Sequence, residues 1–128
     1  MIIRSRDEIA GTGCELDNEH FHSFRLLYKP DGMGFSMTDT YVRPGPGTVL
    51  WYKNHLEACY CVEGEGTVED LATGEVHKLV PGTLYCLDKH DRHHIRSETG
   101  MRLICTFNPP LTGDERHDAD GSFGPSAD

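Results

Sequence analysis

Residues 56–66, LEACYCVEGEG, hold the strand pattern from which the fold of this chain can be worked out. Alternate side chains of a strand point to the same face, so a strand over 57–62 would place Glu57, Cys59 and Cys61 together. A carboxylate on an inward face needs a partner, because an isolated buried charge is costly. A metal ion would be one such partner.

Turn signals flank this stretch and recur roughly every 8–12 residues, which is typical of an all-β sandwich or barrel. They are Pro30-Asp31-Gly32, Pro44-Gly45-Pro46-Gly47, Gly64-Glu65-Gly66, Thr73-Gly74, Pro81-Gly82 and Thr99-Gly100. The short runs between them are rich in Val, Ile, Leu, Tyr, Phe and Thr, residues that favour strands. Helical periodicity is weak, and residues 4–10 alone favour a short helix.

Two further strands indicate which side chains face inward. A strand over 101–107 has one face that is wholly apolar or soft, and this face is the better candidate for a barrel interior. Its members are Met101, Leu103, Cys105 and Phe107. A strand over 83–88 would place Tyr85 on the same face as Thr83 and Leu87.

Length and charge limit the classes of function. A chain of 128 residues fits one compact domain with one core. The 21 acidic against 12 basic residues, a formal charge of -9, disfavour nucleic acid and anionic membrane surfaces as partners. Residues 1–6 lack the apolar run of a signal peptide, and no stretch approaches the roughly 20 apolar residues of a membrane span. These features predict a cytoplasmic protein.

The five cysteines agree with a reducing compartment, because their odd count and spacing do not form a disulfide framework. Cys59 and Cys61 could ligate a soft metal, although their apolar character favours two small buried core residues. The segment 109–128 is rich in Pro, Gly and Asp, and we expect it to be an irregular tail over the barrel mouth. The predicted boundaries are therefore a barrel over 1–108 and a tail over 109–128.

Two short motifs resemble those of cupins, double-stranded β-barrels of the jelly-roll type. Glu57 is followed by Gly64 at the spacing of the first cupin motif, and Gly82 to His93 resembles the second. The two histidines of the first motif are replaced by Trp51 and Lys53. The donors that remain are Glu57, Tyr85 and His93.

A carboxylate, a phenolate and an imidazole suit iron better than copper(I), and zinc is an alternative. Tyr85 could equally be a core tyrosine with a hydrogen-bonded hydroxyl. Of the clustered His90, His93 and His94, the motif favours His93 as the ligand, and at least two of the three are expected to be solvated.

Six blocks of the chain, spread over about residues 25–121, closely resemble the ectoine synthase family. They are DGMGFS (31–36), YKNHLEA (52–58), VEGEG (62–66), PGTLY (81–85), LDKHD (87–91) with His93 nearby, and FNPPLTG (107–113) with Glu115, His117 and Asp118. Where the family usually has Trp and His, this chain has Phe21 and Trp51.

The resemblance implies a cupin fold, a homodimer and a hydro-lyase that makes the compatible solute ectoine from N-γ-acetyl-L-2,4-diaminobutyrate with loss of water. It also implies Fe(II) held by the residues that match Glu57, Tyr85 and His93. The residues that match family substrate contacts are Arg25, Thr40, Tyr52, Cys105, Phe107, Glu115 and His117. The alternatives are another metal-dependent cupin enzyme and a cupin that only binds a small metabolite.

Ring closure requires a polarised amide carbonyl and two proton transfers. Tyr52, Glu115 and His117 are the catalytic candidates, and Tyr85 is a further proton-transfer candidate. His117 titrates in the right range, although by position alone it could be a solvated tail residue. Glu115 could orient His117, as carboxylates commonly do for histidines.

Overall fold

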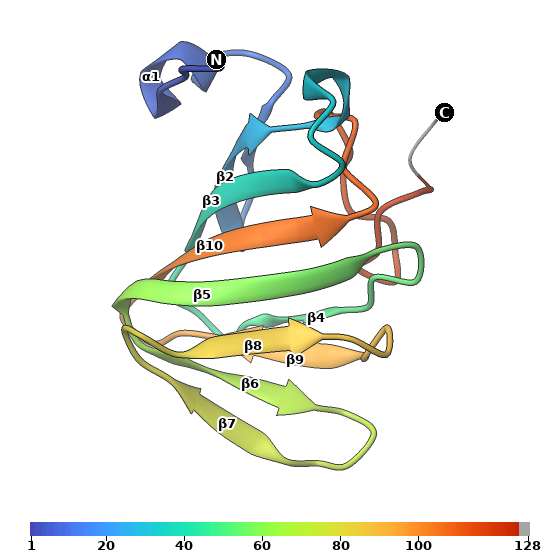
Figure 1. Ribbon diagram of the computed structural model, residues 1–128. Helices are drawn as coiled ribbons and strands as arrows, with labels where there is room; N and C mark the ends of the chain where they lie inside the picture. The colour runs from blue at the N-terminus through green and yellow to red at the C-terminus, as the bar shows by residue number, and fades with distance from the viewer. Residues whose placement is uncertain (126–128) are drawn as a thin grey trace.

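The computed structural model describes residues 1–125, and nearly all of its regular structure is β (Figure 1). The elements are α1 (Arg6–Ile9), β1 (Glu15–Asp17), β2 (Phe21–Leu27), the 3-10 helix η1 (Lys29–Asp31), β3 (Ser36–Val42), β4 (Thr48–Leu50), β5 (Leu56–Gly64), β6 (Gly66–Asp70), β7 (Val76–Leu79), β8 (Leu84–Leu87), β9 (His93–Arg96) and β10 (Met101–Asn108). The predicted strands at 57–62, 83–88 and 101–107 and the short helix within 4–10 are confirmed.

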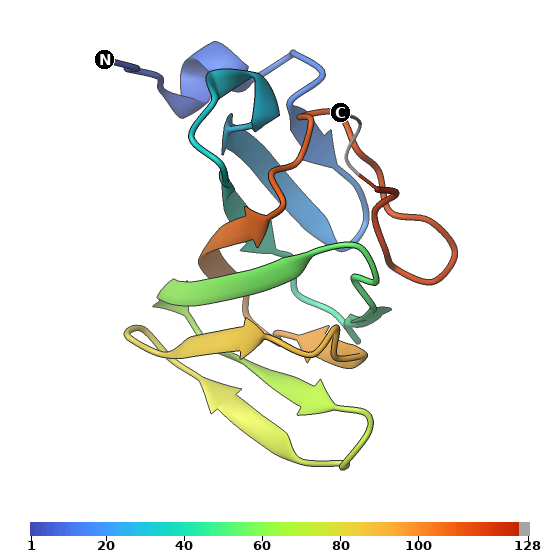
Figure 2. The same cartoon turned by 45° about the vertical axis from the view of Figure 1, so that its right-hand side comes forward.

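The strands form two antiparallel sheets that face each other. The larger sheet has the order β1-β2-β3-β10-β5-β8 and the smaller has the order β4-β9-β6-β7. The chain passes between the sheets at β3–β4, β4–β5, β5–β6, β7–β8, β8–β9 and β9–β10 (Figures 1 and 2). The all-β expectation is confirmed, and the core lies between the two sheets.

The register of the larger sheet aligns one row of side chains across five neighbouring strands. The row runs Arg25, Thr38, Cys105, Cys59 and Tyr85, each directly opposite the next. Directly opposite residues on neighbouring strands share a face. Segments far apart in the sequence therefore contribute adjacent side chains to one interior surface.

Gly64 closes β5 where the chain crosses to the smaller sheet. Its φ of +75° is left-handed, and a Cβ atom there would lie 2.1 Å from the Gly100 carbonyl oxygen. Glycine is the residue that accepts this conformation without a steric penalty. The spacing between Glu57 and Gly64 is therefore set by the length of β5, which ends where its backbone closely contacts Gly100.

The C-terminal segment 109–125 contains no helix or strand, as predicted for this part of the tail, and it runs beside the β4–β5 connection. The expectation of a tail that only lies over the barrel mouth needs correction, because Leu111 and Phe123 are both in the core. Backbone bonds fix it: the Trp51 amide donates to the Gly121 carbonyl at 3.0 Å. Residues 126–128 of the predicted tail lie outside the described residues. Across residues 1–125, no helix combines the length and apolar character needed to cross a membrane.

Candidate active site

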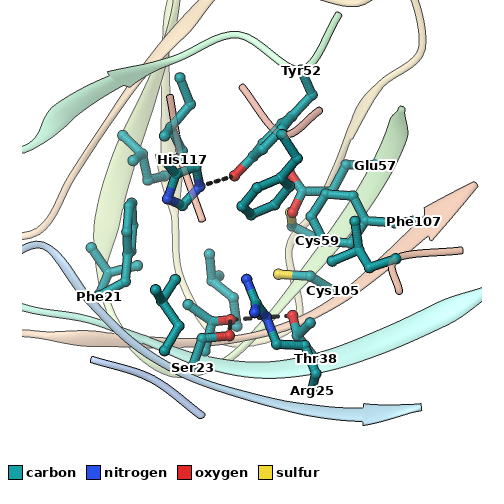
Figure 3. Close-up of a pocket in the computed structure, with 18 of the residues that line it drawn as sticks. Phe21, Ser23, Arg25, Thr38, Tyr52, Glu57, Cys59, Cys105, Phe107 and His117 are labelled. Carbon is teal, nitrogen blue, oxygen red and sulfur yellow. Dashed lines mark hydrogen bonds between the residues drawn. The ribbon is translucent and has the colours of Figure 1, made fainter. Parts of the chain in front are cut away.

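A cavity lies between the sheets and is bordered by side chains from both sheets and the C-terminal segment (Figure 3). Its polar and aromatic lining comprises Phe21, Ser23, Arg25, Thr38, Thr40, Tyr52, Glu57, Cys59, Tyr85, Cys105, Phe107, His117 and Phe123. The cavity has a volume of about 40 Å³, which has room for only a few waters.

Arg25 brings a cation to the cavity from β2. Arg25 is only 1% exposed. Its guanidinium donates hydrogen bonds to the carbonyl oxygens of Gly113 at 3.2 Å and Glu115 at 2.6 Å. Its carbon Cζ also lies 5.5 Å from the centre of the Phe123 ring. Burial and then the charge of Arg116 lower the pKa of Arg25, but a guanidinium stays charged near neutrality. A buried cation held by neutral carbonyls is suited to bind a carboxylate.

His117 and Tyr52 form a pair at the cavity wall. Nε2 of His117 lies 2.9 Å from the Tyr52 hydroxyl, and the His117 ring stacks on Phe123 with centroids 4.3 Å apart. Burial, followed by the charge of Arg25, lowers the pKa of His117 to about 4. Burial also raises the pKa of Tyr52 well above its usual range. Near neutral pH the pair is therefore a neutral imidazole hydrogen-bonded to a neutral phenol.

Glu57, Cys59 and Cys105 meet at one side of the cavity and form a group that could hold a metal ion. All three are buried, and their ligand atoms lie within 4.8 Å of one another. Burial raises the pKa of Glu57 to about 8, although hydrogen bonds from the two thiols oppose this shift. The cluster shares only Glu57 with the ligand set predicted from the sequence.

Tyr85 and His93, the other predicted ligands, occupy different sheets. Tyr85 lines the cavity from β8, whereas His93 belongs to β9 and lines an adjoining groove that Tyr85 also borders. Glu57 and Tyr85 thus line one cavity, and Tyr85 and His93 line the groove beside it. The His93 ring lies beside the Tyr52 ring, with ring centroids 6.3 Å apart.

The hydrogen bonds of His93 nevertheless suit a metal ligand. Its Nδ1 lies 2.9 Å from the Asp91 carbonyl oxygen, which can only accept, so Nδ1 carries the proton. Nε2 then presents a lone pair, and this buried atom has no hydrogen-bond partner within the described part of the chain. Backbone acceptors orient metal-binding histidines in this way. The imidazole, carboxylate and phenol therefore fit a metal ion in their donor chemistry.

Glu115 lies outside the cavity lining. Its carboxylate accepts hydrogen bonds from the backbone amides of Thr112 at 2.6 Å and Gly113 at 2.9 Å. Its carbonyl accepts from Arg25, as described above. Glu115 thus holds the loop that carries His117, whereas the sequence led us to expect a direct orienting contact with His117.

Several cavity residues were not singled out by the sequence. Ser23 and Thr38 join Thr40 in a hydroxyl network, with Ser23 Oγ 2.8 Å and Thr38 Oγ1 3.2 Å from Thr40 Oγ1. Their period-2 spacing along β2 and β3 is a signal that could have found them. Phe123 gave a weaker signal, as an isolated aromatic residue in a polar segment.

Comparison with known proteins gives one consistent family. The family model described as ectoine synthase matches residues 1–127. The chain is 57% identical over 124 residues to the L-ectoine synthase of Desulfosudis oleivorans, covering 96% of each chain. The structure resembles the crystal structure of ectoine synthase from P. lautus, with a TM-score of 0.83, 48% identity and coverage of 88% and 81%. An RmlC-like cupin from Shewanella frigidimarina matches with a TM-score of 0.62 and 26% identity, covering 74% of this chain and 81% of that one. The two antiparallel sheets therefore form a cupin fold.

Proposed function

This chain belongs to the ectoine synthase family, and we propose that it is a hydro-lyase that cyclises N-γ-acetyl-L-2,4-diaminobutyrate to ectoine with loss of water. The observation that carries the proposal is the match over nearly the whole chain to curated L-ectoine synthases. The cavity supports it, because it combines a buried cation, a proton-transfer pair and a carboxylate in one enclosed space.

The reaction needs no oxidant or reductant. The free amine of the substrate bonds to the acetyl carbon, and the carbonyl oxygen leaves as water with two protons taken from nitrogen. The buried guanidinium of Arg25 is the natural partner for the substrate carboxylate. Phe107 and Phe21 would then enclose the folded chain, so that the amine and the acetyl group are held close together.

Tyr52 and His117 are suited to the proton transfers. His117 is neutral at neutral pH, so it can accept a proton from the attacking amine directly or through the Tyr52 hydroxyl. The same proton can return to the departing oxygen, which leaves the pair unchanged after a turnover. Enclosure by Phe123 keeps bulk water from competing for these protons.

We assign Fe(II) to Glu57, Tyr85 and His93. The support is the buried Nε2 atom of His93, together with the buried carboxyl group of Glu57 and the half-buried phenol of Tyr85, which border the neighbouring space. Bound iron would supply a Lewis acid that polarises the amide carbonyl. This chain's own residues bind the carboxylate, hold the reacting groups together and move the protons.

The direct test of the activity is to incubate the full chain with N-γ-acetyl-L-2,4-diaminobutyrate and Fe(II) under reducing conditions. Ectoine should appear, and mass spectrometry should show a loss of one water relative to the substrate. Substrate recovered intact at several enzyme concentrations, from protein shown to be folded and iron-loaded, would overturn the proposed reaction.

The iron assignment has its own test. Glu57→Ala and His93→Ala should each remove bound iron and activity while circular dichroism still reports a folded barrel. His94→Ala is the matched control, because His94 neighbours His93 on β9 and is only half-buried. Full iron content in either ligand variant would contradict this set of ligands.

We also propose a cytoplasmic homodimer. The five cysteines are free thiols, which fits a reducing compartment. Tyr60 and Leu84 lie directly opposite each other on β5 and β8, and they are 47% and 59% exposed. An exposed apolar pair formed by the edge strand β8 and its neighbour β5 favours association with a second copy. Light scattering should give twice the chain mass, and a monomer at working concentration would contradict the dimer.

A further inference from the structure

We propose that Cys59, Cys105 and Glu57 form a second metal-binding mode of the cavity, selective for a thiophilic divalent ion such as Zn(II) or Cd(II). Their ligand atoms all lie within 4.8 Å of one another. Donors around one ion with bonds of about 2.0–2.3 Å lie roughly 3–4 Å apart, so small side-chain rotations bring the three into range.

The sheet register holds these donors in place. Cys59 and Cys105 are directly opposite on β5 and β10, and Glu57 is two residues before Cys59, on the same face. The two cysteines are 1% and 3% exposed and Glu57 is 8% exposed. Figure 3 shows their side chains converging on the same part of the cavity. The donors therefore come from two paired central strands rather than from a mobile loop.

The chemistry of the donors separates this mode from the proposed iron site. Two thiolates and one carboxylate favour zinc and cadmium, whereas carboxylate, phenolate and imidazole favour iron. On binding, the two thiols lose their protons to solvent and the ion takes their sulfur lone pairs, so no electron transfer is involved. Tyr85, directly opposite Cys59, is placed to offer a fourth donor.

The two modes exclude each other because both need Glu57. A thiophilic ion would also bind Cys105, which borders the cavity beside Arg25 and Thr38. It follows, if the proposed function holds, that Zn(II) or Cd(II) displaces iron and blocks the substrate. The binding mode itself does not depend on that activity.

Cadmium titration of the metal-free, reduced full chain tests the proposal, because cadmium–thiolate bonds absorb in the ultraviolet. The exposed Cys86 and partly exposed Cys14 are first replaced by serine to remove background binding. One equivalent of Cd(II) should then produce a thiolate band. Cys59→Ser and Cys105→Ser should each reduce the band about twofold, and Glu57→Gln should weaken cadmium affinity about tenfold or more.

Cys61→Ser is the matched control. Cys61 is also buried on β5, yet its thiol donates weakly to the carbonyl oxygens of Glu63 and Gly64. Its replacement should leave the band unchanged, as should His93→Ala. No band in the parent chain, or an undiminished band in folded Cys59→Ser and Cys105→Ser proteins, would overturn the site; alanine replacements check that serine is not itself a ligand.

The outcome is separable from that of the proposed function. A chain that shows the two-thiolate band but makes no ectoine with Fe(II) would keep this site and reject the reaction. A chain that makes ectoine but shows no band would support the reaction and reject this site.

Discussion

The Tyr52 hydroxyl and Nε2 of His117 lie 2.9 Å apart although 65 positions separate the residues in sequence. One belongs to the β4–β5 connection and the other to the C-terminal segment. Because both members are neutral near pH 7, the pair can take up a proton from the substrate amine, at His117 directly or through the Tyr52 hydroxyl, and return it later in the turnover.

Tyr52→Phe and His117→Gln should each lower kcat on the order of 100-fold or more, as expected for loss of a proton-transfer group. The double variant should cost little more than either single change, because the two residues act as one unit. Steady-state kinetics with iron content measured in parallel checks this. His77→Gln, an exposed histidine on β7, is the control. Strictly additive effects would show that the two residues act independently.

His117 should also make stability depend on pH. Its folded pKa is about 4 against an ordinary value of 6.5, so between these values the unfolded chain takes up a proton that the folded chain does not. The stabilisation is therefore complete above pH 6.5 and is lost as the pH falls towards 4, by up to about 3 kcal/mol. Urea unfolding of the parent chain and His117→Gln should converge over this range; parallel pH curves would refute the linkage.

Much of the fold could be predicted because it rests on local signals. The alternation of side chains predicted β5, β8 and β10, and pairs of Pro and Gly residues indicated the turns between strands. The interior face of β10 followed from its apolar alternation, and the structure buries Met101, Leu103, Cys105 and Phe107 as predicted. These patterns are local, so they can be interpreted without knowing which strands pair.

The cavity is harder to predict because it depends on pairing across sequence distance. The Cys59–Cys105 contact requires the β5–β10 register, which no local pattern specifies. Phe123 was missed because an irregular segment has no periodicity to show that its side chain is buried. The contacts of Glu115 were also not predicted, for a related reason. Its carboxylate accepts hydrogen bonds from backbone amides of its own loop, and a side-chain pattern does not show such bonds.

Glu115 should act by positioning the loop rather than by transferring a proton. Glu115→Gln keeps an oxygen that can accept from the Thr112 or Gly113 amide, so it should retain most of kcat. Glu115→Ala should lower kcat at least about tenfold with unchanged iron content. Asp114→Ala is the neighbouring exposed control. If glutamine were as damaging as alanine while the fold stayed intact, the carboxylate would be a catalytic group instead.

The C-terminal segment should work as a lid whose opening admits the substrate. His117 and Phe123 of this segment border the cavity, whose volume of about 40 Å³ holds only a few waters in the described arrangement, so we expect the segment to move when the substrate enters. Apart from the buried Phe123 ring, residues 117–123 are held by contacts outside any strand ladder, such as the Lys53 ammonium to the Asp120 carboxylate at 2.7 Å. Hydrogen exchange over 117–123 should therefore be faster than over β10, and ectoine should slow it.

Shortening the chain after Pro110 tests the same lid by removing it. Ectoine formation should be abolished because His117 is lost, whereas iron should still bind, since Glu57, Tyr85 and His93 all precede the cut. The loss of Leu111 and Phe123 from the core should also destabilise the barrel by several kcal/mol.

Phe123→Ala separates these effects, because it keeps His117 but removes the ring stacked on it. This variant should lower both the stability and kcat, while Phe123→Leu should recover most of the stability and less of the rate. A shortened chain that forms ectoine at the parent rate would show that the segment is dispensable and that His117 takes no part in the chemistry.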